Sequence, residues 1–197
     1  MLYEKKDYLH SSSIIDFEHP LILAKAQELK GDASSDVVIA KNCFTFVRDH
    51  IRHTGDHKDA IITCKASDVL AYETGWCYAK SHLLAALCRA NGIPAGFCYQ
   101  RLSLVNNGSE PYMLHGLNAI YLKDFDWYRV DARGNKEGIH AEFSPPLEQL
   151  AFKVKTAHEI DFQEILNEPL SLVITALQTY TRFEESLQHL PDCIEIT

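Results

Sequence analysis

In the first half of the chain, apolar residues recur at every third or fourth position, which is the spacing of one face of an α-helix. A helix is therefore expected from about Ser35 to His53, and another between Pro20 and Gly31. A shorter helix should begin at Ser67. The apolar stripe of the longest helix consists of Val37, Ala40, Phe44, Val47 and Ile51.

After Pro94 the pattern changes to runs of aromatic and β-branched residues, which are typical of strands. The polar segment 106–111 ends the first run, and residues 123–126 form a turn between the next two. The tail is expected to be helical again from Pro169 onward. This order of helices, antiparallel strands and helices indicates an α+β fold. The expected strands are residues 95–105, 115–122 and 127–133.

A helix is also expected between the two halves, from Cys77 to about Asn91, with Gly92 and Pro94 to end it. A glycine-containing turn places Cys77 in the first turn of this helix. The helix dipole favours a thiolate there, and free backbone N–H groups can stabilise an oxyanion. The alternative is a buried cysteine of an apolar helix, which is what most cysteines are. Cys77 is therefore a candidate nucleophile that needs partners.

Length and composition narrow the class of protein. The chain has 197 residues, 46% of them hydrophobic, which is enough for one core, so residues 1–197 are expected to form a single domain. A net charge of −8 and the lack of a basic run argue against nucleic acid and anionic membranes as partners. The N-terminus lacks a signal-peptide pattern and no apolar stretch has membrane-spanning length, so a cytoplasmic location is expected. The six cysteines include no CxxC pair and are expected to stay reduced.

A cysteine nucleophile needs a base, and ten histidines are available for that role. His50, His53 and His57 could face one way and bind zinc with Cys64, but their spacing fits no standard zinc pattern and Gly55 should interrupt the helix. His82 lies five residues after Cys77, about 500° round the helix, and should point away from it.

His115 and Asp131 fit the requirement better. They lie sixteen residues apart, at the start of one expected strand and near the end of the next, so a hairpin would bring them together. Both side chains share a face only if the turn holds an odd number of residues or includes a bulge. With residues 122–124 as the turn, His115 would lie directly opposite Asp131. The alternatives are a polar strand-end histidine and a turn acid paired with Arg133.

These residues resemble the transglutaminase-like superfamily over about residues 18–135. The segment GWCYAKSHLLAALCRANGIPA resembles the family's cysteine motif, LHGLNAIYL its histidine motif and WYRVDARGN its aspartate motif. The resemblance implies a papain-like core and a catalytic triad of Cys77, His115 and Asp131. Animal transglutaminases use calcium, but this chain has no EF-hand loop, so no cofactor or metal is expected. A C-terminal helical extension over about 145–197 lies outside the resemblance.

Two positions depart from the family pattern. Trp76 stands where many transglutaminases have glutamine, and Gly96 where arginine is common. In this family a residue well upstream often donates the second hydrogen bond of the oxyanion hole, and the sequence does not identify it. Asn42 is a candidate, but a solvent-facing position on a helix is the favoured interpretation of this residue.

The implied chemistry is acyl transfer, or hydrolysis of an amide or peptide bond, through a thioester, with a protein or peptide as substrate. Water as the second reactant would make a cysteine protease or amidase, and an amine would make a protein-glutamine acyltransferase. The compact form slightly favours hydrolysis. A non-catalytic peptide-binding or scaffolding module with the same fold is the alternative, and a homo-oligomer stays possible.

Overall fold

The computed structural model describes residues 4–105 and 109–196. The expected 106–111 turn therefore falls partly outside the described residues. The helices are η1 (Lys5–Leu9), α1 (Pro20–Lys30), α2 (Asp36–His50), α3 (Thr54–His57), α4 (Ala66–Tyr72), α5 (Cys77–Ala90), α6 (Ser171–Thr179) and α7 (Phe183–Gln188). The strands are β1 (Arg52–His53), β2 (Thr74–Gly75), β3 (Ala95–Ser103), β4 (Tyr112–Leu122), β5 (Asp126–Val130), β6 (Glu142–Ser144), β7 (Leu147–Gln149) and β8 (Ile160–Asp161).

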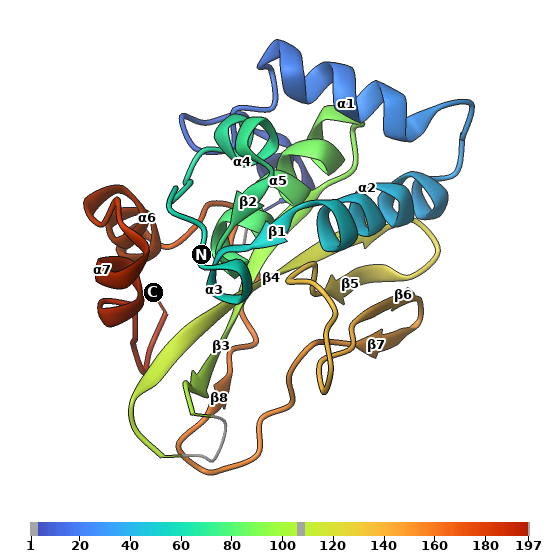
Figure 1. Ribbon diagram of the computed structural model, residues 1–197. Helices are drawn as coiled ribbons and strands as arrows, with labels where there is room; N and C mark the ends of the chain where they lie inside the picture. Colours follow the sequence, from blue (N-terminus) through green and yellow to red (C-terminus); the bar gives the residue numbers. More distant parts are fainter. Residues whose placement is uncertain (1–3, 106–108, 197) are drawn as a thin grey trace.

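Helix α5 is the centre of the molecule, with α1, α2 and α4 packed around it (Figure 1). Every residue from Cys77 to Arg89 is buried, which explains why this segment is apolar on nearly all sides. The helix ends as expected, with Gly92 at a positive φ of 73°. Its burial on all sides makes it the rigid element that holds Cys77.

The long helix expected from Ser35 begins as predicted, with Ser35 as its N-cap, but it ends at His50 rather than His53. Arg52 and His53 instead form β1, which pairs in parallel with β2. Because of this pairing, the chain leaves the helix after His50 and runs beside the turn that precedes Cys77. The expected length was wrong because a pairing partner twenty residues away is invisible to local periodicity.

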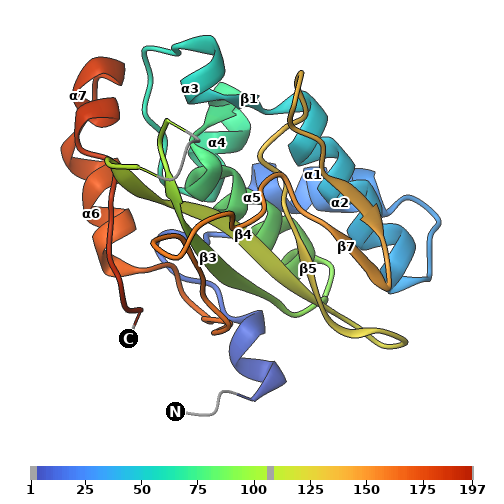
Figure 2. The same ribbon diagram turned by 90° about the horizontal axis from the view of Figure 1, so that it is seen from below.

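The main sheet has the strand order β5-β4-β3-β8, and its pairs are antiparallel. Figure 2 shows α1, α2, α4 and α5 on one side of this sheet and the C-terminal segment crossing the other. Strand alternation places Leu117 and Ala119 on the second side, where they pack with Cys98, Leu150 and Ile165. The fold is therefore α+β with both faces of the sheet covered.

Between residues 145 and 196 the chain is helical only in α6 and α7, and the short strands β7 and β8 precede them. The main buried cluster includes residues from Ile14 to Ile196, so the two ends of the chain share packing with α5. The core and extension limits expected from the sequence stay predictions. Among the helices in the described ranges, none combines the length and apolar character needed to cross a bilayer.

Candidate active site

Cys77 is the first residue of α5, as its sequence context predicted, and Trp76 is the N-cap. The turn before it is tight: a Cβ on Gly75 would lie 2.9 Å from the Cβ of Ala79 and 3.4 Å from the backbone nitrogen of Lys80. Only glycine allows the chain to enter the helix this closely. Cys77 itself is 4% exposed.

His115 and Asp131 lie on the same face of the sheet and form a direct contact, with 2.7 Å between Nε2 of His115 and Oδ2 of Asp131. The loop that joins their strands runs from Lys123 to Phe125, an odd number of residues, as the shared face required. The exact register differs from the expected one, because Asn118 lies opposite Val130. Asp131 therefore meets His115 diagonally across the two strands rather than directly opposite it.

The third contact joins the helix to the sheet. The pairing of β4 with β5 ends at Asn118 and Val130, so Gly116 on β4 lies beyond it. The backbone N–H of Gly116 donates to Sγ of Cys77 at 3.4 Å. A Cβ on Gly116 would lie 3.1 Å from Cα of Tyr78, so the strand can approach the helix this closely only at a glycine. The Tyr78 hydroxyl also donates to the carbonyl of Leu114. These contacts place Cys77 within hydrogen-bonding reach of His115.

The charges of the three groups reinforce one another. Burial lowers the pKa of His115, but the charges of Asp131 and Cys77 and hydrogen bonds to both raise it to about 10. Burial would raise the pKa of Asp131, yet His115 and the backbone N–H groups of Arg133 and Ala151 hold it below its ordinary value. An ionised Asp131 beside a protonated His115 is the state that this environment favours. Since Asp131 occupies Nε2, Nδ1 is the ring nitrogen left to face Cys77.

The alternative expected from the sequence, an ion pair of Asp131 with Arg133, is replaced by a hydrogen bond from the Arg133 backbone. The Arg133 N–H donates to Oδ1 of Asp131 at 3.1 Å, whereas its guanidinium binds Asp56 at 2.6 and 2.9 Å. The sequence did not point to the other contacts. The Ala151 N–H donates to Asp131 at 3.1 Å, and the Phe152 ring packs edge-on against His115 with 4.9 Å between centroids. Both belong to an irregular segment that carries no motif, and only the folded chain brings it here.

The two departures from the family pattern have structural causes. A Cβ on Gly96 would lie 2.5 Å from Cγ2 of Ile165, because the C-terminal segment packs flat on this strand. Trp76 is held by the same part of the chain: its Nε1 donates to Oγ of Ser186 at 2.9 Å, and the Phe183 ring stacks on it at 6.0 Å. The side chain of Asn42 donates to the carbonyl of Leu29 on the exposed surface. Asn42 is therefore a surface residue of α2, as the sequence indicated, and not an oxyanion-hole donor.

Two other histidines considered from the sequence, His82 and His53, have different contacts. The Nδ1–H of His82 donates to the carbonyl of Cys64 at 2.7 Å, and burial lowers the pKa of His82 to about 4. His53 packs edge-on against Trp76. In residues 4–105 and 109–196, no group of three or more His, Cys, Asp or Glu side chains is arranged to hold a metal ion.

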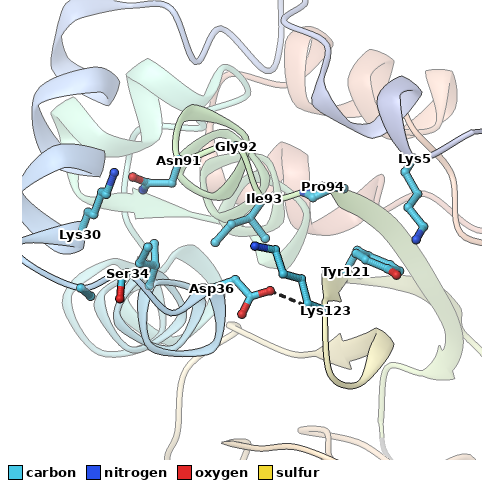
Figure 3. Close-up of a pocket in the computed structure, with 12 residues that line it drawn as sticks. Lys5, Lys30, Ser34, Asp36, Asn91, Gly92, Ile93, Pro94, Tyr121 and Lys123 are labelled. Carbon is cyan, nitrogen blue, oxygen red and sulfur yellow. Dashed lines mark hydrogen bonds between the residues drawn. The ribbon is translucent and has the colours of Figure 1, made fainter.

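Two large cavities lie at opposite ends of α5. One, of about 720 Å³, includes Trp76, Phe152 and Arg133 in its lining and so borders the Cys77 end. The other, of about 560 Å³, borders Asn91 and Gly92 at the far end, together with Lys30 and Lys123 (Figure 3). A helix of this length separates them by roughly 20 Å, so of these two cavities the first is the one beside Cys77.

Two solved structures are similar to part of this chain. A candidate cysteine protease from Cytophaga hutchinsonii is 18% identical and superposes with a TM-score of 0.53, over 68% of this chain and 43% of that one. The periplasmic domain of TgpA from Pseudomonas aeruginosa, solved with ethylmercury, is 19% identical with a TM-score of 0.47, over 65% of this chain and 48% of that one. The chain thus spans less than half the length of either protein. No curated protein matches its sequence. The sequence model of the transglutaminase-like superfamily matches residues 24–132, more than half of the chain, and the protein belongs to that superfamily.

Proposed function

We propose that the protein is a cysteine enzyme that transfers or hydrolyses acyl groups through a thioester on Cys77, with His115 and Asp131 as its acid–base partners. The substrate is a carboxamide or peptide bond of a protein or peptide. The observation that carries the proposal is the buried chain of contacts from Asp131 through His115 to Cys77 at the start of a helix. Three separate elements supply these groups, which is the arrangement expected of a catalytic site.

In the first step, the Cys77 thiolate attacks the carbonyl carbon and forms a C–S bond. The oxyanion lies near the backbone N–H of Cys77, which intrahelical bonding leaves free at the first position of α5. His115 gives its Nδ1 proton to the leaving nitrogen as the C–N bond breaks, and an amine or ammonia departs. Asp131 keeps the ring oriented throughout.

In the second step, water or an amine attacks the thioester carbonyl and gives a proton to His115. The C–S bond then breaks and Cys77 leaves as the thiolate, which restores the starting state. Water yields a carboxylic acid and an amine yields a new amide. Both outcomes share the same intermediate, and exclusion of water from the site decides between them.

The deciding experiment incubates the protein with glutamine-containing peptides, with and without a primary amine, and measures peptide masses. Deamidation, backbone cleavage and amine incorporation each give a different mass change. Cys77→Ala should abolish every one of them without unfolding the protein. Cys98→Ala is the matched control, because Cys98 is also buried but packs with Leu117 and Ala119 in a separate cluster from the one that contains Cys77. Full activity in Cys77→Ala would disprove the mechanism.

Labelling provides a check that needs no substrate. Iodoacetamide near neutral pH should modify Cys77 far faster than Cys88 or Cys98. The Cys88 thiol shares a hydrogen bond with Cys43 and burial raises the pKa of Cys98 to about 12, so neither forms a thiolate readily. Peptide mass spectrometry of the labelled protein identifies the modified cysteine. Equal labelling of several cysteines in the folded protein would remove the case for a nucleophile.

A further inference from the structure

The cavity beside Cys77 has a composition that points to its occupant. It has a volume of about 720 Å³, within the usual range for binding pockets. Its inner end is formed by Trp76, which precedes the nucleophile, and by Phe152, whose ring contacts His115. The cavity therefore borders the residue that precedes Cys77 and the ring that packs on His115.

The walls of the cavity are mainly apolar. Leu102 and Met113 lie opposite each other on β3 and β4, on the same face of the sheet as His115. The stacked rings of Trp76 and Phe183 also line the cavity, and Leu187 and Leu190 add apolar surface from α7 and the residues after it. Two leucines of the lining, Leu104 and Leu187, are 39% and 38% exposed, so apolar surface of the cavity is open to solvent.

The charged groups of the lining do not favour an ion. Asp56 pairs with Arg133 and Lys136, at 2.6 and 2.5 Å. Glu159 accepts the backbone N–H groups of Ser103 and Lys155. The remaining charged lining residues are exposed and balance in sign: Lys58, Lys153, Glu137 and Glu184.

We propose that this cavity binds an apolar side chain of the acyl donor, leucine-like or aromatic, next to the carbonyl that Cys77 attacks. The proposal rests on the function proposed above and specifies its substrate class. The α7 wall lies beyond residues 24–132, so the C-terminal part of the chain supplies one side of this cavity. Burial of an apolar side chain here provides binding energy that can position the adjacent carboxamide.

The test compares two reagents that carry the same electrophile, iodoacetamide and N-benzyl-2-iodoacetamide. Alkylation rates at Cys77 are measured by peptide mass spectrometry and divided by the rates with a small free thiol. The benzyl reagent should react about tenfold faster by this ratio, because its ring occupies the apolar cavity while the electrophile reaches Sγ. Leu187→Asn and Leu104→Asn should both lower the ratio.

Leu147→Asn is the matched control, since Leu147 is 73% exposed and is not among the residues that line the cavity. It should leave the ratio as in the wild type. Equal or slower alkylation by the benzyl reagent would overturn the cavity assignment and leave the nucleophile intact. A ratio that falls as much in Leu147→Asn would overturn it as well. Failure of both reagents to label Cys77 would instead remove the proposed function, and this inference with it.

Discussion

At the residue scale, burial governs what each titratable group can do. Cys77, His115 and Asp131 are 4%, 1% and 0% exposed, so the charges of the three groups interact with little screening by water. His82 is buried on the same helix as Cys77, but no carboxylate of the described residues acts on it, and burial lowers its pKa to about 4, which keeps it neutral. The difference between the two histidines is therefore the carboxylate beside His115. The sequence favoured His115 over His82 because helix geometry turns His82 away from Cys77, and strand geometry predicted the contact of His115 with Asp131 that the structure contains.

His82 should make the protein sensitive to acid. Its pKa is about 4 in the folded state and about 6.5 when exposed, so the unfolded chain binds the proton first as the pH falls. The resulting contribution to stability is complete above pH 6.5 and is lost as the pH falls towards 4. His82→Gln keeps a donor for the Cys64 carbonyl but cannot titrate. Between pH 7 and pH 4 the wild type should lose roughly 1–3 kcal/mol more of its unfolding free energy than this variant, measured with urea.

At the element scale, close contacts that depend on glycine decide how strands meet their neighbours. Gly116 lets β4 approach the start of α5, and Gly96 lets the C-terminal segment lie flat on β3. The sequence showed Gly96 only as a departure from the family pattern. The structure explains it, since the space that an arginine would need is filled by Ile165 and Tyr8.

Gly96→Ala should therefore destabilise the protein by about 1–3 kcal/mol, and Gly96→Arg by more, because even a Cβ overlaps Ile165 and the Leu166 carbonyl. Urea unfolding monitored by tryptophan fluorescence measures both. The alanine variant measures the cost of the Cβ contact alone, whereas the arginine variant also adds a charge. Wild-type stability in Gly96→Arg would show that the C-terminal segment does not pack on β3.

At the scale of the whole molecule, one buried arginine joins distant parts of the chain. Arg89 at the end of α5 donates to the carbonyls of Ala95 on β3, at 2.9 and 3.1 Å, and of Asn167, at 2.5 Å. It also donates to the carbonyl of His10 at 2.7 Å. The N-terminal segment, the central strand and the C-terminal segment therefore depend on a single planar group, which a lysine cannot replace.

Arg89→Lys should lower the unfolding free energy by about 2–4 kcal/mol, because a lysine leaves at least one of these buried carbonyls without a donor. Arg52→Lys is the matched control: its side chain is 41% exposed and it should change stability by less than about 0.5 kcal/mol. Thermal and urea unfolding of both variants provide the comparison. Equal stability of the two variants would rule out this role for Arg89.

The sequence by itself determined the local elements and the identity of the candidate triad. Helix periodicity, glycine stops and the parity of the β4–β5 turn are properties of neighbouring residues, so Cys77 at a helix start and His115 on the same face as Asp131 could be predicted. Tertiary structure alone decided the early end of α2, the diagonal register, the contacts of Ala151 and Phe152, and the cavity walled by α7. These features depend on contacts between residues far apart in the chain. No spacing along the sequence encodes such contacts, and packing selects them only when the whole core forms.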